Sequence, residues 1–238
     1  MENNLKGEIE ELELKLKSLK AKKKNFPLSL EKTERDLSRG VRKNNRVYSV
    51  RSNRDRFYFP HEWRKFDDQL KDNQKKTFDC LISTGARINE IRNAEVGDVD
   101  FVNKRIILRV TKVKSKKGEK NPRPRTIPIS SQFARRLKSY TKDMANNEKL
   151  GLLSTPASNI AMKKALQRAG IKDYYMFSIH NIRKTLENWL IALGVDAVRI
   201  SKHFGHDIST AIQHYTSPDI FSAKEKNEMR DLIGDLYT

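Results

Sequence analysis

The sequence predicts a mainly α-helical protein with a small antiparallel β-hairpin or sheet, preceded by an N-terminal coiled-coil-like helix. Three observations lead to this fold class. Apolar residues recur at helical spacing through most of the chain, two strand-like segments lie near its middle, and a heptad pattern opens it. We expect three parts: a coiled-coil-like helix at 1–26, a basic linker or arm at 27–56, and a main domain at 57–238.

The chain is strongly basic. Its 238 residues include 49 Lys and Arg against 30 Asp and Glu, which gives a formal net charge of +19. Such an excess indicates a polyanionic partner, and nucleic acid leads the candidates. No apolar run approaches the length of about 18 residues that suggests a membrane-spanning helix. No secretory signal follows Met1, and the single Cys80 excludes a disulfide framework or a multi-cysteine zinc site, so we expect a cytoplasmic protein without a membrane partner.

The first helix carries the seam of a coiled coil. Its apolar residues alternate at spacings of four and three: Leu5, Ile9, Leu12, Leu16 and Leu19. The seam is short, so self-association and packing on the protein's own domain both remain open. Pro27 ends this helix at about Phe26.

The arm that follows is polar and basic. From residue 41 to residue 56 it carries six basic residues and one acid. Basic side chains at this density are typical of a segment that follows a phosphate backbone, so we expect Arg42, Lys43 and Arg46 to bind DNA. A disordered tail is the alternative.

The main domain is expected to be a series of helices. It opens at Pro60, a helix-start residue, ahead of an apolar face that includes Trp63 and Phe66. Further helices are expected at 72–83, up to Asn93, and at 131–146, 156–169, 180–193, 195–204 and 219–236. Strand signals at 105–111 and 125–129 flank a loop rich in Lys, Gly and Pro, and these signals predict the hairpin.

Two segments place an arginine near the start of a helix. In Thr84-Gly85-Ala86-Arg87-Ile88-Asn89-Glu90, a glycine turn delivers the arginine one helical turn before an acid. In His180-Asn181-Ile182-Arg183, the spacing puts histidine and arginine on one helix face, where both can point at one anionic group. Taken alone, the first is typical of a structural ion pair and the second of an ordinary helix surface.

A third segment, Phe204-Gly205-His206, is followed by Tyr215. Together, in kind, order and spacing, the three segments resemble the motifs of the tyrosine recombinase (integrase) family. The likeness covers about 57–220 and implies the catalytic-domain fold of that family. The catalytic residues that it implies are Arg87, Lys112, His180, Arg183, His206 and Tyr215.

The lysine of this set has more than one candidate. The family's lysine lies on a β-hairpin between the two arginine motifs, just after the first strand, and Lys112 fits that place. Lys114 and Lys120 remain alternatives because the loop is long. The basic residues of this hairpin that we expect to bind DNA are Lys114, Lys116, Lys117, Lys120, Arg123 and Arg125.

The resemblance implies DNA cleavage and rejoining through a covalent 3′-phosphotyrosyl intermediate. The two motif arginines would bind the non-bridging phosphate oxygens and offset the charge that develops there, so neither a metal ion nor another cofactor is expected. Tyr215 would attack phosphorus and His180 would accept its proton. Lys112 would protonate the 5′ oxygen that leaves, and His206 would donate to a non-bridging oxygen.

The expected function is site-specific recombination or integration on double-stranded DNA. Strand exchange needs four protomers on DNA, and like charge should keep the free protein a monomer or weak dimer. The segment after Tyr215 would either dock on a neighbouring protomer or fold back on its own domain. A virus or plasmid is a natural source of such a gene.

Two departures from the family leave other interpretations open. About 56 residues precede the catalytic part, so the DNA-clamping domain is either reduced or belongs to a longer protein of which this is a fragment. Phe204 also stands where leucine is commoner. The alternatives are a type IB topoisomerase, which relaxes DNA by the same chemistry, and a basic DNA-binding protein without catalysis.

Overall fold

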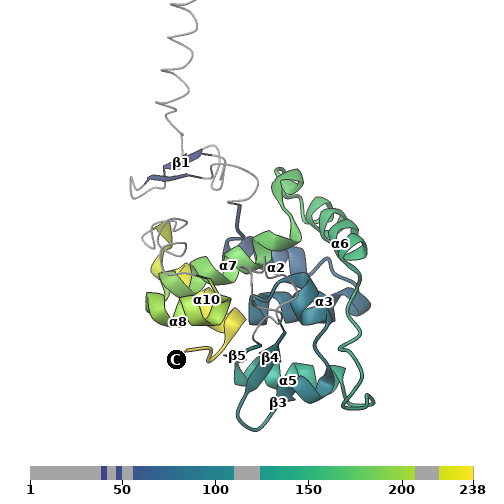
Figure 1. Ribbon diagram of the computed structural model, residues 1–238. Helices are drawn as coiled ribbons and strands as arrows, with labels where there is room; N and C mark the ends of the chain where they lie inside the picture. The colour runs from purple at the N-terminus through teal and green to yellow at the C-terminus, as the bar shows by residue number, and fades with distance from the viewer. Residues whose placement is uncertain (1–38, 42–46, 50–55, 110–123, 207–219, 238) are drawn as a thin grey trace, which may run out of the picture. The chain divides into compact units, whose positions relative to one another are not determined.

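The computed structural model describes residues 39–41, 47–49, 56–109, 124–206 and 220–237. The chain divides into two compact units, Met1–Ser49 and Val50–Thr238 (Figure 1). Among the described residues, no helix is long and apolar enough to cross a membrane. The coiled-coil-like helix predicted at 1–26 lies outside the described residues.

The first unit contains a β-hairpin that the sequence did not predict. Strand β1 (Arg39–Val41) pairs antiparallel with β2 (Val47–Ser49), and Gly40 lies opposite Tyr48. Valine and tyrosine favour strands, but three residues a side give too short a pattern to detect. The predicted DNA contacts Arg42, Lys43 and Arg46 fall between the two strands, outside the described residues.

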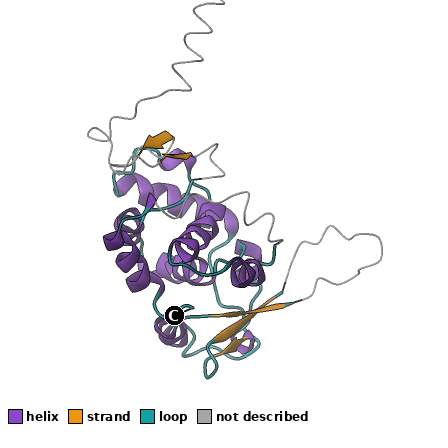
Figure 2. Ribbon diagram, turned by 90° about the vertical axis from the view of Figure 1, so that its left-hand side faces the viewer, coloured by secondary structure: helices purple, strands orange, loops and turns teal. Residues whose placement is uncertain are grey.

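The second unit confirms a mainly helical fold with a small antiparallel sheet. Its α-helices are α2 (Pro60–Asp67), α3 (Asp72–Thr84), α4 (Ile88–Arg92), α5 (Ser131–Tyr140), α6 (Thr155–Arg168), α7 (Ile179–Ala192), α8 (Ala197–Phe204) and α10 (Ala223–Ile233). Short 3-10 helices span Val96–Asp98 (η2) and Tyr174–Met176 (η3). The sheet lies at one end of the helical body, beside α5 (Figures 1 and 2).

Two helices are shorter than predicted, each for a local reason. Helix α5 ends at Tyr140, where Thr141 leaves the helical conformation at φ −113°; the Thr141 amide and hydroxyl both donate to the Leu137 carbonyl, at 3.0 and 2.9 Å. Helix α10 begins late because Ser222 and Glu225 form a capping box: the serine hydroxyl accepts from the Glu225 amide and the carboxylate accepts from the Ser222 amide.

The sheet has one strand more than the predicted hairpin. Its order is β3 (Val99–Asp100), β4 (Arg105–Leu108) and β5 (Arg125–Pro128), all antiparallel. Ile106 lies opposite Ile127, and both side chains are buried, whereas Ile107 is 39% exposed. One face of the sheet therefore packs on the core. The loop that carries Lys112 lies outside the described residues.

Helices α3 and α7 pack together and bring the two arginine motifs into one region. The contact is close because of Gly85, which caps α3 in the left-handed conformation at φ 57°. A β-carbon at Gly85 would lie 2.5 Å from the Phe204 ring and 3.0 Å from Leu186. Only glycine fits both this conformation and this approach. Cys80, earlier in α3, is fully buried.

Residues 220–237 pack on the unit to which they belong. Helix α10 packs against α2 and α7, and Met229 and Ile233 are buried. Phe221 lies 5.3 Å from Phe59 between ring centres. Of the two interpretations of this tail, the described residues show the second, because its apolar face is covered within the same chain.

Candidate active site

The structure places four of the six predicted catalytic residues within its described part. Arg87 is the N-cap of α4, His180 and Arg183 lie on the first turns of α7, and His206 follows the end of α8. Lys112 and Tyr215 lie outside the described residues, so their positions and roles stay predictions.

Arg87 and Arg183 are held in different ways. The Arg87 guanidinium donates to Glu90 at 2.7 Å, and its side chain remains 43% exposed. Arg183 is buried: it donates to the Gly85 carbonyl at 2.8 Å and to the Phe204 carbonyl, and it lies over the Phe204 ring. Carbonyls that accept from a guanidinium fix its plane without neutralising its charge.

The charge on Arg183 persists despite its burial. Burial lowers the pKa of Arg183 to about 9, and the neighbouring cations Arg87 and Arg125 act in the same direction. Glu90 and Glu187 oppose them. At neutral pH the guanidinium therefore remains protonated, and a buried positive charge that is held by carbonyls favours binding of an anion.

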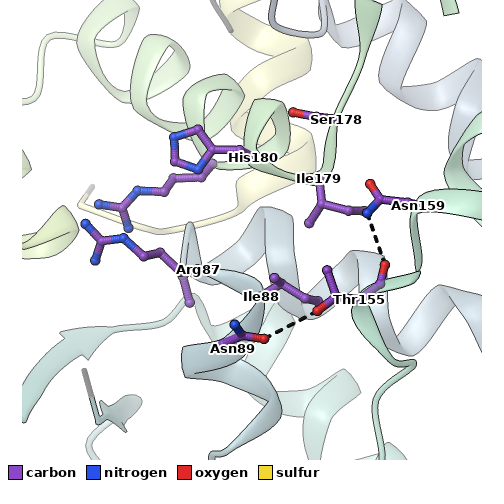
Figure 3. Close-up of a pocket in the computed structure, with 10 residues that line it drawn as sticks. Arg87, Ile88, Asn89, Thr155, Asn159, Ser178, Ile179 and His180 are labelled. Carbon is purple, nitrogen blue, oxygen red and sulfur yellow. Dashed lines mark hydrogen bonds between the residues drawn. The ribbon is translucent and has the colours of Figure 1, made fainter. Parts of the chain in front are cut away.

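Both arginines line one cavity with a volume of about 320 Å³. His180 shares its wall, and the side chains of Arg87 and His180 extend in the same direction (Figure 3). The remaining wall is uncharged and combines apolar residues such as Ile88 and Ile179 with polar ones, of which Asn89 is hydrogen-bonded to Thr155 at 3.3 Å. Two arginines on the wall of one cavity suit a phosphodiester.

His180 is held in its neutral form by its surroundings. The surrounding protein and then the cations Arg183 and Lys184 lower the pKa of His180 below its ordinary value of 6.5, although the residue keeps solvent access. The imidazole is therefore neutral at neutral pH, and a neutral ring has a nitrogen that can take a proton. The same lowering of the pKa makes the ring a weaker base, and the role of His180 as general base stays a prediction.

His206 has a partner that the sequence did not predict. Its Nε2 lies 2.9 Å from the Glu187 carboxylate, and both side chains are largely buried. Its ring stacks on Phe204. Glu187 stands four residues after Arg183, so it projects from the same face of α7. This spacing of four residues was the one signal in the sequence that could have identified Glu187 as part of the site.

Arg125 does not occupy the exposed position expected of a DNA contact. Its side chain is 11% exposed and donates twice to Glu90, at 2.7 and 3.1 Å. Its Nε donates to the His203 carbonyl at 3.1 Å. Arg125 thus joins the β4–β5 hairpin to the first arginine motif and to the end of α8. Its DNA-binding role remains a prediction that this burial does not favour.

The Glu90 carboxylate accepts hydrogen bonds from two arginines, Arg87 and Arg125. Burial by itself would raise its pKa, but hydrogen bonds from Arg125 and Arg87 outweigh burial and lower the pKa of Glu90 to about 2. The carboxylate is 0% exposed. Glu90 was part of the recognised motif, yet its pairing with Arg125, 35 positions away, is not visible in the sequence.

His203 is a second group that the sequence did not single out. It is buried, with Nε2 2.9 Å from the Thr84 carbonyl and Nδ1 2.9 Å from the Tyr237 hydroxyl. A carbonyl can only accept, so Nε2 carries the proton and Nδ1 accepts from tyrosine. Burial lowers the pKa of His203 to about 3, although its bond to Thr84 acts in the opposite direction. The ring is therefore neutral and ties the C-terminal segment to the first arginine motif.

Breaking the Glu90–Arg125 pair should be strongly destabilising, because the buried carboxylate then lacks one of its two partners. Arg125→Gln leaves the buried carboxylate with Arg87 alone and should lower the free energy of unfolding by about 3–5 kcal/mol, measured by urea denaturation. The control is Arg109→Gln, whose bond to Asp98 involves an arginine that is 56% exposed, and this should cost less than about 1 kcal/mol. Equal losses in the two variants would show that Arg125 contributes no more than a surface ion pair.

Stability should fall as the pH drops from 6.5 to 5 because of His203. Its pKa is about 3 in the folded protein and near 6.5 when unfolded, so the unfolded chain binds more protons in this range. The free energy of unfolding should therefore rise with pH, by at most about 1.4 kcal/mol per unit for one proton. Urea denaturation of His203→Gln, compared with the wild type at pH 5 to 7, should show a shallower slope; an unchanged slope would refute the assignment.

The sequence matches known proteins over most of the second unit. A model of the phage integrase family matches residues 59–220. The chain is 27% identical over 176 residues to the tyrosine recombinase XerA of Thermococcus onnurineus, covering 70% of this chain and 58% of that protein. It is 24% identical over 188 residues to the integrase of a Salmonella phage, covering 71% of this chain and 46% of that protein. The chain thus spans about half the length of these curated relatives.

Solved structures share the fold. The crystal structure of XerA recombinase superposes with a TM-score of 0.54 at 18% identity, covering 74% of this chain and 64% of that chain. The Tn1549 transposon integrase in complex with a circular intermediate DNA gives 0.56 at 14% identity, covering 74% and 65%. These likenesses show the fold, and the family model covers more than half of the chain. The protein therefore belongs to the phage integrase family.

Proposed function

We propose that this chain is the catalytic part of a site-specific DNA recombinase or integrase, which cleaves and rejoins strands through a 3′-phosphotyrosyl intermediate. The single observation that carries the proposal is the cavity that Arg87, His180 and Arg183 line. It offers two fixed guanidiniums and a neutral imidazole, which are the groups that phosphoryl transfer to a tyrosine requires. Membership of the phage integrase family supports the same reaction.

The arginines would act on the charge that develops during the reaction. Attack on phosphorus adds negative charge to the non-bridging oxygens, and preorganised donors stabilise that charge without reorganising. Arg183 is held by two carbonyls and Arg87 by Glu90, so neither has to be ordered when DNA binds. His206, oriented by Glu187, would donate to one of these oxygens.

Proton transfer would fall to His180 and a lysine. The neutral ring of His180 would take the proton from the attacking tyrosine, for which Tyr215 is the proposed nucleophile. Lys112 would protonate the 5′ oxygen as it leaves. The reaction would need no ATP, because the phosphotyrosyl link retains the bond energy for rejoining.

Double-stranded DNA is the proposed partner. The net charge of +19 supports it, as does the shared fold with an integrase whose structure contains DNA. We propose a homo-tetramer on DNA and a monomer or weak dimer in free solution, in the cytoplasm. The phage relative supports a mobile genetic element as the source.

Replacing the nucleophile tests the proposal. On a nicked suicide substrate, wild-type protein should become covalently attached to DNA, whereas Tyr215→Phe should form no adduct and keep its DNA affinity within about twofold, because binding depends on many phosphate contacts. The control is Tyr237→Phe, since the Tyr237 hydroxyl is bonded to His203 and should not react.

Denaturing gels measure the yield of the covalent adduct for wild type and for Tyr215→Phe. An adduct of normal yield in Tyr215→Phe would refute the assigned nucleophile, and the absence of any adduct with wild type would refute the proposed function. Supercoil relaxation without strand exchange would favour the topoisomerase alternative.

A further inference from the structure

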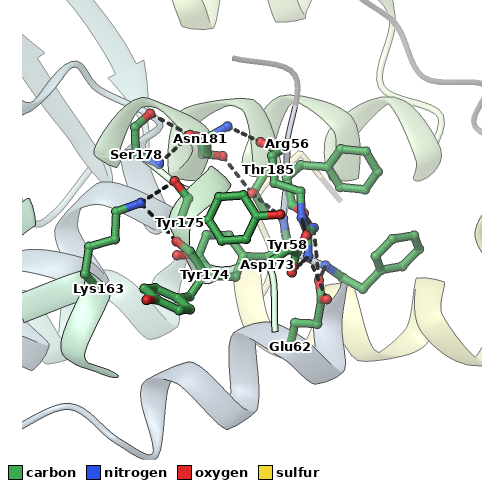
Figure 4. Close-up of polar contacts among 12 residues, drawn as sticks. Arg56, Tyr58, Glu62, Lys163, Asp173, Tyr174, Tyr175, Ser178, Asn181 and Thr185 are labelled. Atoms are coloured by element: carbon green, nitrogen blue, oxygen red, sulfur yellow. Dashed lines mark hydrogen bonds and ion pairs between the residues drawn. The ribbon is translucent and has the colours of Figure 1, made fainter. Parts of the chain in front are cut away.

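The last residue of the predicted basic arm, Arg56, is fully buried. Its Nη2 lies 2.8 Å from the Glu62 carboxylate and its Nε lies 2.7 Å from the Asp173 carboxylate, while the guanidinium covers the Phe177 ring at 4.1 Å (Figure 4). The Arg56 guanidinium thus contacts helix α2 through Glu62 and the segment before α7 through Asp173 and Phe177. Asp173 is 117 positions away from Arg56. The mechanism proposed above uses none of these residues.

The backbone beside Arg56 is hydrogen-bonded to α7. The Asn181 side-chain amide donates to the Arg56 carbonyl, the Tyr58 amide donates to the Thr185 hydroxyl at 2.9 Å, and the Trp189 indole donates to the Tyr58 carbonyl at 3.0 Å. The three α7 residues are spaced by four, so they form one stripe along the helix. Figure 4 shows Asn181 and Thr185 beside Arg56 and Tyr58.

Arg56 therefore contacts both the segment that precedes α7 and the first turn of that helix. Asp173 and Phe177 belong to the segment that leads into the helix, and Asn181 lies on its first turn. The same Asn181 closes the helix start, since its Oδ1 accepts from the Ser178 amide at 2.6 Å. His180, the residue before Asn181, and Arg183, two residues after it, line the candidate active site.

We propose that Arg56 is a positioning residue of the active site, which fixes the first turn of α7 and so the aim of His180 and Arg183. This inference rests on the proposed function. Its physical basis is geometric: the guanidinium binds Glu62 and Asp173 through different nitrogens of one rigid plane, whereas the donors of a lysine ammonium all leave from one nitrogen and cannot keep both bonds in the same geometry. Stability alone gives a weak reason for such a group, because buried ion pairs contribute little net free energy over apolar packing.

The direct test compares Arg56→Lys with Arg136→Lys. Arg136 is the control, because it forms two bonds to one carboxylate, 2.7 and 2.7 Å from Asp79, but joins α5 to α3 and is 40% exposed, so the two variants are compared at the same folded fraction. Single-turnover attachment to a suicide substrate should slow by about tenfold to hundredfold in Arg56→Lys, since small misplacements cost this much. DNA affinity should stay within about twofold, and Arg136→Lys should cleave at the wild-type rate.

A milder pair of variants covers the case in which Arg56→Lys folds poorly. Thr185→Val removes the acceptor for the Tyr58 amide with almost no change in shape, and Thr185→Ser restores it. Attachment should slow in the valine variant and recover in the serine variant. Equal attachment rates in Thr185→Val and Thr185→Ser would overturn the proposal. So would an attachment rate that falls no further in Arg56→Lys than in Arg136→Lys when both are compared at the same folded fraction.

A measurement without DNA separates this inference from the proposed function. NMR titration of the five histidines would follow His180, assigned from a His180→Gln spectrum. Loosening the first turn of α7 exposes the ring to water and weakens its contact with Arg183 and Lys184, so the pKa of His180 should rise toward 6.5 in Arg56→Lys and Thr185→Val and stay unchanged in Arg136→Lys. An unmoved midpoint in the first two overturns the positioning role. Failure of wild type to attach to DNA would refute the proposed function, while the shifted midpoint would still show that Arg56 positions His180.

Discussion

One buried carboxylate makes the active site possible. Arg87, Arg125 and Arg183 lie close together, so that both Arg87 and Arg125 lower the pKa of Arg183. Such a group of like charges repels itself in the interior of a protein. Glu90 accepts from Arg87 and Arg125, which leaves Arg183 to be held by carbonyls and to keep its charge for an anionic ligand. The first arginine motif needs its acid for this reason.

The same constraint explains the glycines around the site. Carbonyls of Gly85 and Phe204 accept from Arg183, so two backbone turns must approach its guanidinium. Gly85 and Gly205 both adopt positive φ, and a β-carbon at Gly205 would lie 3.2 Å from the Arg125 side chain. Gly205 therefore permits a close approach of the backbone to Arg125, and Gly85 permits a close approach to Phe204 and Leu186, in addition to turning the chain.

Much of the fold followed from periodicity. Helices α3, α6 and α7 begin and end within a residue or so of prediction, because long apolar stripes and capping residues agree there. The strands β1, β2 and β3 escaped detection because two or three residues hold no measurable period. The late start of α10 was readable, since Ser222 and Glu225 have the spacing of a capping box.

The motif residues of the site could be predicted from the sequence, but the residues that hold them in place could not. Arg87, His180 and Arg183 were identified from local patterns, and the structure brings them to one cavity. The partners that hold the site come from distant parts of the chain: His203 reaches Thr84 across 119 positions, and Arg56 reaches Asp173 across 117. Composition even suggested the wrong environment for Arg56, because a buried arginine and a solvated one look the same in a basic segment.

The central claim is that Arg87 and Arg183 stabilise negative charge on the non-bridging oxygens of a phosphodiester. The most direct measurement is the single-turnover rate of covalent attachment, for wild type and Arg87→Gln, on two DNAs that differ only at the cleaved linkage. One has the natural phosphodiester and the other a neutral methylphosphonate. If the claim holds, Arg87→Gln slows the first reaction by about a hundredfold or more and the second by less than about tenfold, because the neutral linkage develops less charge. Equal slowing on both linkages would contradict it.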